Sequence, residues 1–265
     1  MIMRWALILA AAAAWGCNSQ PYMTAARQEL GLVIVLSGIE GRSVLTDDIA
    51  RGLNKGGVEY AITVHPWTSD WGGPLYNLRA QERNRRQAEK LAARIEEYQM
   101  DHPDRPVFLV GHSGGSAIAV WTAESLSPSR QVEGIVLIAP ALSPAYPLDM
   151  ALVHSRRGIV NFYSELDMLL GVGTAVAGTM DGRYTSSAGA VGFRSSPGEE
   201  GMAYENLFEI GWRREMALTG NIGGHLSSTT TYFVSTYVAP LITAPGWNQT
   251  LMDDLVRRRL PQPPP

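Results

Sequence analysis

Short, uninterrupted apolar runs recur along the chain, and segments with helical periodicity separate them. The runs occupy Leu32–Leu36, Tyr60–Val64, Val107–Val110, Ile135–Ala139 and Ile159–Tyr163, with a weaker one at Asn206–Ile210. A strand that is buried on both faces has this kind of continuous apolar sequence, which is typical of parallel sheets covered by helices. Parallel neighbours also need crossover connections, which are usually helices. The pattern therefore predicts an α/β fold with a doubly wound, mostly parallel sheet of about six strands.

The connecting segments carry the spacing of helices. Ala88, Leu91, Ala92 and Ile95 repeat at i, i+3, i+4 and i+7, and charged residues occupy the other faces. Residues 114–126 and 229–238 are further candidate helices, and a proline follows each of them closely.

The composition excludes several classes of protein. Of the 265 residues, 45% are hydrophobic and 18% are charged, which is enough for a sizeable core and excludes global disorder. The formal net charge is −3 and the only basic cluster, Arg257–Arg259, lies near the end, so we expect no nucleic-acid partner. The single cysteine excludes an internal disulfide and the common cysteine-rich zinc sites.

The amino-terminal segment has the features of an export signal. Arg4 precedes an apolar run of about twelve residues, which is too short to span a bilayer. The lone Cys17 follows at once, and Ala14–Cys17 resembles the lipobox of bacterial lipoproteins. This resemblance implies cleavage before Cys17 and acylation of that residue, so that the protein is exported and membrane-anchored through its lipid. The alternative is an ordinary cleaved signal with an incidental cysteine.

One turn carries the strongest chemical signal. Gly111-His112-Ser113-Gly114-Gly115 matches G-x-S-x-G, directly after a predicted strand and before a predicted helix. The glycines permit a turn so sharp that the Ser113 hydroxyl stands at the carboxyl edge of the sheet. At the start of a helix, backbone N–H groups favour developing negative charge. Ser113 is therefore the candidate nucleophile.

A serine nucleophile needs a histidine base and an acid that orients it. His225 lies in a loop after the last predicted strand, and His65, which also ends a strand, is the second choice. Asp167 lies just beyond the strand at Ile159–Tyr163. Its rivals are Glu165 and Asp181, of which Asp181 with the following glycine is typical of a turn.

The order Ser113, Asp167, His225 resembles that of the α/β-hydrolase family, over about residues 32–238. A further match is Ser37-Gly38-Ile39-Glu40-Gly41, which is similar to the family's oxyanion-hole loop with serine in place of the usual histidine. The resemblance implies that the backbone N–H groups of Ile39 and Gly114 bind the oxyanion and that no cofactor is required. It also implies a sheet trimmed to about six strands. The connection from Ala139 to Ile159 is too short for a separate cap domain.

These inferences divide the chain into a signal peptide (1–16), a lipidated tether (17–30), an α/β-hydrolase domain (31–258) and a proline-rich tail (259–265). The expected activity is that of a serine esterase that cleaves a small-molecule carboxylic ester through an acyl-enzyme. A peptidase or amidase on the same fold, and a non-catalytic surface lipoprotein with a vestigial site, remain the alternatives.

Two segments are expected to wall the substrate site. One contains Trp67 and Trp71, whose aromatic rings either line an apolar site or pack on the domain. The other spans 169–201, is rich in glycine, and is long enough to form a lid.

Overall fold

The computed structural model describes residues 20–167, 174–194 and 202–257. Cys17, the predicted signal peptide and the proline-rich tail lie outside the described residues, as do both ends of the 169–201 segment. Residues 20–30 pack on the domain, because the Arg27 guanidinium donates hydrogen bonds to the Tyr60 carbonyl oxygen and to Asn54. Ordered packing therefore begins ahead of the first strand.

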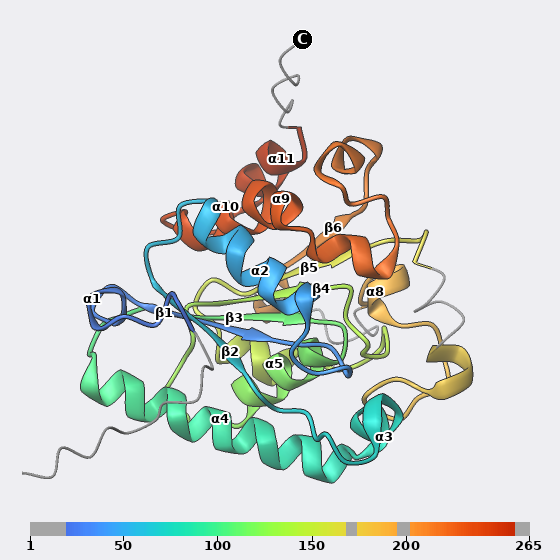
Figure 1. Ribbon diagram of the computed structural model, residues 1–265, viewed down its shortest axis with the longest axis horizontal. Coiled ribbons are helices and arrows are strands. Elements are labelled where there is room, and N and C mark those ends of the chain that lie inside the picture. The colour runs from blue at the N-terminus through green and yellow to red at the C-terminus, as the bar shows by residue number, and fades with distance from the viewer. Residues whose placement is uncertain (1–19, 168–173, 195–201, 258–265) are drawn as a thin grey trace, which may run out of the picture.

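Six parallel strands form one sheet in the order β2-β1-β3-β4-β5-β6 (Figure 1). The strands are β1 (Leu32–Leu36), β2 (Ala61–His65), β3 (Val107–His112), β4 (Gly134–Ile138), β5 (Ile159–Tyr163) and β6 (Leu207–Gly211). The predicted α/β architecture with about six strands is confirmed. Three strands, β2, β4 and β6, are each shifted by one residue from their predicted positions. The strand β3 continues beyond its predicted end to His112, because His112 still pairs with Ile138 of β4. All six carboxyl ends therefore meet at one edge.

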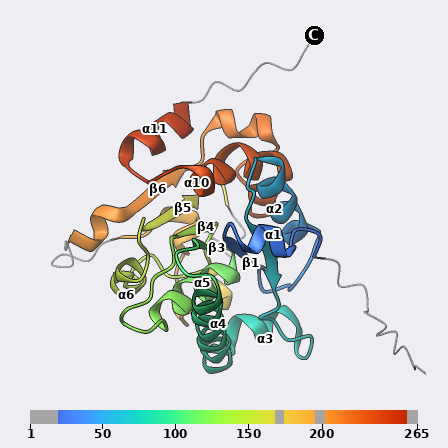
Figure 2. The same ribbon diagram turned by 90° about the vertical axis from the view of Figure 1, so that its left-hand side faces the viewer.

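Helices cover both faces of this sheet. On one face lie α4 (Gln81–Asp101), α5 (Gly114–Glu124) and α6 (Asp149–Val153), and on the other lie α2 (Val44–Lys55), α9 (Thr231–Phe233), α10 (Ala239–Thr243) and α11 (Gln249–Arg257) (Figures 1 and 2). Alternate residues of β1 supply the two cores, with Ile34 facing α4 and α5 and Val35 facing the opposite layer. Both faces are buried, which explains the uninterrupted apolar runs.

Short elements complete the chain. They are α1 (Ala25–Gln28), α3 (Gly73–Arg79), α8 (Ala188–Val191) and the turns η1 (Met202–Asn206), η2 (Arg214–Thr219), η3 (His225–Thr229) and η4 (Val234–Val238). The connection from β4 to β5 holds only the five-residue α6, so no cap domain is inserted there.

The last predicted helix differs from the observed one. Residues 231–243 continue past the expected stop, because the π-helical turn η4 leads into α10 and places Pro240 in the first turn of that helix. A proline is tolerated there because the first turn has no intrahelical partner for its missing N–H. The helical segment packs closely on α2, where a β-carbon on Gly52 would lie 2.6 Å from Val234 Cβ.

Candidate active site

The turn between β3 and α5 holds Ser113 in a strained conformation. Its φ of 53° and ψ of −121° lie outside the regions that non-glycine residues normally occupy. Tight packing enforces the turn: a β-carbon on Gly111 would lie 2.6 Å from Ser116 Cα, and one on Gly115 would collide with the Leu36 and Ser37 carbonyl oxygens. The two flanking glycines are thus required by close backbone approach, as the motif predicts.

Backbone hydrogen bonds fix the strained serine from both sides. Its N–H donates to the Ile138 carbonyl oxygen at 3.0 Å, and its carbonyl oxygen accepts from the Ala141 N–H at 3.1 Å. Strain of this kind persists only where the surroundings over-determine it, and it concentrates at functional sites. Ser113 is 5% exposed, so the side chain lies in a nearly closed space at the carboxyl edge.

Asp167 and His225 meet at the same edge, although 58 residues separate them in the chain. The His225 Nδ1–H donates to Asp167 Oδ2 at 2.9 Å, with Asp167 2% and His225 7% exposed. Asp167 follows β5 and His225 opens η3 after β6. Since the carboxylate can only accept this hydrogen bond, it fixes the tautomer in which His225 Nε2 is unprotonated and able to take a proton.

His225 also packs on the serine turn. The rings of His112 and His225 lie 4.9 Å apart between centroids, and His112 Nε2 lies 3.4 Å from the His225 carbonyl oxygen. Burial, followed by the charge that His225 can carry, lowers the pKa of His112 to about 3. His112, the residue before Ser113, therefore stays neutral at physiological pH, and its ring packs against the ring of His225.

The alternative candidates for the acid and the base do not lie next to Asp167 or His225 in a comparable buried pair. Glu165 is exposed, and Asp181 accepts hydrogen bonds from the backbone and side chain of Ser143 within a turn. His65 ends β2, four strand positions from β5, a separation of about 19 Å at the usual spacing of about 4.8 Å. Burial, and secondarily Arg94, lower the pKa of His65 to about 4. Asp167 and His225 are the pair that the structure brings together.

The loop after β1 lies against the start of α5. A β-carbon on Gly114 would lie 2.6 Å from Ile39 Cγ2 and 3.5 Å from the Ile39 backbone nitrogen. The two N–H groups assigned to oxyanion binding thus come from adjoining segments. Met180 borders the same place, with its sulfur 3.3 Å from that β-carbon position.

Two buried side chains donate hydrogen bonds to the loop after β1, and no pattern in the sequence predicts these contacts. The Trp67 indole N–H donates to the Ser37 carbonyl oxygen at 2.9 Å, and Asn77 Nδ2 donates to the Ile39 carbonyl oxygen at 2.9 Å. Trp67 is fully buried, which places it in the core and not on the wall of an open substrate site. Trp71 is 81% exposed and packs edge-on against Tyr76.

Two further features are absent from the described ranges. No helix within residues 20–167, 174–194 and 202–257 combines the length and apolar character that a membrane span requires. The same part of the chain contains no cluster of three or more side chains suited to holding a metal ion.

Similar solved structures include a lipase and two esterases. Aspergillus fumigatus lipase B is 12% identical, with a TM-score of 0.54 over 89% of this chain and 58% of the lipase, so the chain spans less than two thirds of its length. Est1E from Butyrivibrio proteoclasticus is 9% identical, with a TM-score of 0.49 over 87% of this chain and 90% of Est1E. Esterase PE8 is 15% identical, with a TM-score of 0.44 over 77% of this chain and 91% of PE8.

The sheet topology, the serine turn and this likeness in fold define an α/β hydrolase. The chain belongs to the family described as serine aminopeptidase, S33, whose model matches residues 27–170, more than half of its length. That match includes the oxyanion loop, Ser113 and Asp167, and it ends before His225. No protein among curated sequences matches this chain.

Proposed function

We propose that this hydrolase cleaves a carboxylic ester through an acyl-enzyme on Ser113, with His225 as base and Asp167 as its orienting acid. The observation that carries the proposal is the buried 2.9 Å hydrogen bond between His225 and Asp167, made by a histidine whose ring packs on the residue next to Ser113. A serine hydroxyl is a weak nucleophile, and a base with its free nitrogen fixed by a carboxylate is what activates it.

The reaction proceeds in two halves. Ser113 Oγ attacks the ester carbonyl carbon while its proton passes to His225 Nε2, and the backbone N–H groups of Ile39 and Gly114 stabilise the resulting oxyanion. The bond to the alkoxy oxygen then breaks, and the leaving alcohol takes the proton from Nε2. Water attacks the acyl-enzyme with His225 again as base, which releases the acid and restores Ser113. Asp167 stays ionised and stabilises the imidazolium in both halves.

Labelling of the purified wild-type protein with a fluorophosphonate tests this proposal. We expect stoichiometric labelling of the folded protein and none after heat denaturation, because only an activated serine displaces the fluoride. A folded protein that stays unlabelled would instead indicate the binding-module alternative.

A peptidase is the second candidate, because the matched family is described as a serine aminopeptidase. Short p-nitrophenyl esters and aminoacyl p-nitroanilides separate the two activities, since the esters release p-nitrophenol and the anilides release p-nitroaniline, each as a coloured leaving group from an acyl carbon. Turnover of the anilides with no turnover of the esters would replace the ester proposal by the peptidase one.

The oxyanion loop provides a first prediction. Asn77→Ala removes the side chain that donates to the Ile39 carbonyl oxygen, so the Ile39 N–H loses its fixed direction. We expect kcat for p-nitrophenyl butyrate to fall about tenfold with KM little changed, because an oxyanion donor acts mainly in the transition state. Asn161→Ala is the matched control, since Asn161 is equally buried but lies on β5 and bonds to Glu209. Equal kcat in both variants would contradict a positioning role for Asn77.

We further propose that the protein is exported and anchored to a membrane through a lipid on Cys17. The support is the sequence alone: the charged start, the short apolar run and the position of the only cysteine. Cys17→Ser should move the protein from the membrane fraction to the soluble fraction when expressed in a bacterial host, with metabolic labelling by palmitate lost in parallel. Undiminished membrane retention of that variant would refute the anchor.

A further inference from the structure

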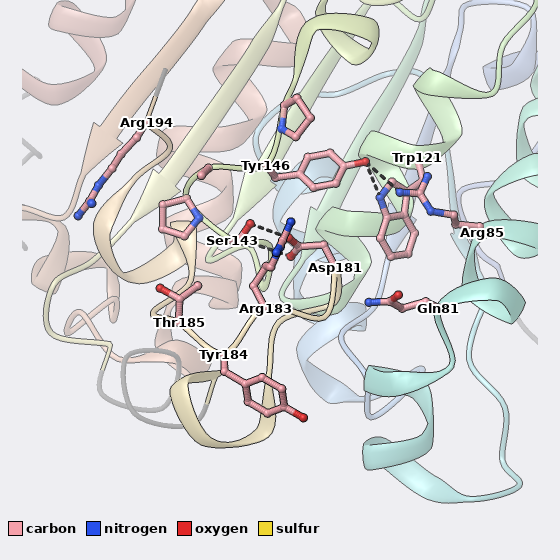
Figure 3. A pocket seen from close by; sticks show the side chains of 13 residues that line it. Gln81, Arg85, Trp121, Ser143, Tyr146, Asp181, Arg183, Tyr184, Thr185 and Arg194 are labelled. Atoms are coloured by element: carbon pink, nitrogen blue, oxygen red, sulfur yellow. Dashed lines mark hydrogen bonds between the residues drawn. The ribbon is translucent and has the colours of Figure 1, made fainter. Parts of the chain in front are cut away.

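An open cavity of about 610 Å³ lies on the side of the sheet that α4 and α5 cover (Figure 3). The start of α4, the side of α5, the loop after β4 and the turn around Asp181 surround it. Its walls include the rings of Trp121, Tyr146 and Tyr184. A cavity with aromatic walls and a few polar groups is the usual form of a small-molecule site.

Two arginines in this cavity have no acidic partner in the part of the chain that the structure describes. Arg183 and Arg194 are both exposed, and no described residue forms a salt bridge or hydrogen bond with either guanidinium. Arg85 differs, because it forms an ion pair with Glu124 at 3.4 Å and stacks on Trp121.

The carboxylate of Asp181, the remaining charged group in the described lining, already accepts hydrogen bonds. Asp181 accepts the Ser143 N–H at 2.8 Å and also the Ser143 hydroxyl. Since Glu124 offsets Arg85, Arg183 and Arg194 stand against one carboxylate among the described residues that line the cavity, and this lining carries an excess of positive charge. Guanidinium groups bind carboxylates and phosphates with paired hydrogen bonds, which makes such an excess suited to an anion.

Hydrogen bonds connect the two loops that carry the cavity residues to the nucleophile turn. The Ala141 N–H donates to the Ser113 carbonyl oxygen at 3.1 Å, and the Met180 N–H donates to the Ala141 carbonyl oxygen at 2.8 Å. Ser143, which lines the cavity, lies two residues after Ala141 in the chain. Asp181, which also lines it, directly follows Met180. Two residues of extended chain span about 7 Å, so the cavity begins within the length of a small substrate from Ser113.

We propose that this cavity binds the anionic end, a carboxylate or phosphate, of an ester whose carbonyl group is presented to Ser113. Arg183 and Arg194 hold the anion, and the aromatic walls contact the chain between the anion and the ester. This inference rests on the proposed esterase activity for its catalytic readout, whereas the anion site itself can be measured without catalysis.

Two matched substrates test the catalytic part. The mono-p-nitrophenyl ester of adipic acid and p-nitrophenyl hexanoate have the same acyl length and differ by a terminal carboxylate in place of a methyl group. Arg183→Gln and Arg194→Gln should each lower kcat/KM for the adipate ester about threefold, and the double variant about tenfold, in line with solvent-exposed charge pairs. Hydrolysis of the hexanoate ester should stay within about twofold of wild type. Arg105→Gln, an exposed arginine at the opposite edge of the sheet, is the control that should change neither.

Direct binding tests the anion site alone. Adipate and inorganic phosphate are titrated calorimetrically into Ser113→Ala and into the same variant that also carries the two arginine substitutions. Binding that is lost with the arginines and weakens with added NaCl supports the site even if neither ester is hydrolysed, in which case the proposed esterase activity fails by itself. The stronger ligand of the two identifies the anion. An unchanged preference between the two esters in the double variant, together with unchanged or absent anion binding, would overturn the proposal.

Discussion

Ser113→Ala is expected to lower kcat for p-nitrophenyl butyrate about 10⁶-fold, the loss found when a serine hydrolase is deprived of its nucleophile. Alanine removes only the hydroxyl, so the N–H groups of Ile39 and Gly114, which we propose as oxyanion donors, and the His225–Asp167 pair stay in place. The residual rate is therefore expected to exceed that in buffer, because these groups still bind and polarise the ester. Progress curves at high enzyme concentration measure both quantities.

The fold of the variant should be retained. The strained backbone at Ser113 is held by hydrogen bonds of its own N–H and carbonyl group, which alanine also has. Thermal unfolding should therefore occur within a few degrees of wild type. Ser125→Ala is a suitable control, since Ser125 only caps α5 through a hydrogen bond to the Trp121 carbonyl oxygen. Full activity in Ser113→Ala would remove this serine from the mechanism.

Much of the fold could be predicted from the sequence because strands buried on both faces have few polar positions in their apolar runs. The same argument places the ends of β5 and β6 at one edge and so predicts that Asp167 and His225 are neighbours; their side chains make a hydrogen bond of 2.9 Å. The sharp turn around Ser113 could also be predicted from its glycines, because backbone packing there leaves no room for a β-carbon.

The residues that hold the loop after β1 in place could not be predicted from the sequence. Asn77 and Trp67 bond to the loop after β1 only because α3 and the loop before it lie against that loop, and no local pattern encodes that placement. The grouping of Arg183 and Arg194 likewise depends on how the segment after β5 returns to the sheet edge. The helical segment was predicted to end before Pro240, but the π-helical turn η4 leads into α10 and the segment continues through this proline.

Asp167→Asn should lower kcat about 10⁴-fold while leaving the fold intact. The carboxylate accepts the Nδ1–H of His225 at 2.9 Å and so leaves Nε2 free as the base. An asparagine amide can turn its NH₂ group toward Nδ1, which favours the opposite tautomer, with the proton on Nε2 and no base facing the serine. The loss also includes the stabilisation of the imidazolium, because the amide carries no charge. KM should change little, since neither effect requires contact with the bound substrate.

Glu165→Gln is the matched control, since it makes the same loss of charge two residues away, at an exposed carboxylate. Its kcat should stay within about twofold of wild type, as is usual for an exposed carboxylate outside the site. Proton NMR of the His225 ring adds a readout that is independent of turnover: the Nδ1–H resonance of a buried hydrogen-bonded imidazole should be present in wild type and Glu165→Gln and shifted in Asp167→Asn. If Glu165→Gln carried the large loss and Asp167→Asn kept full activity, the acid would have to be reassigned to Glu165, against the burial and the contact of Asp167.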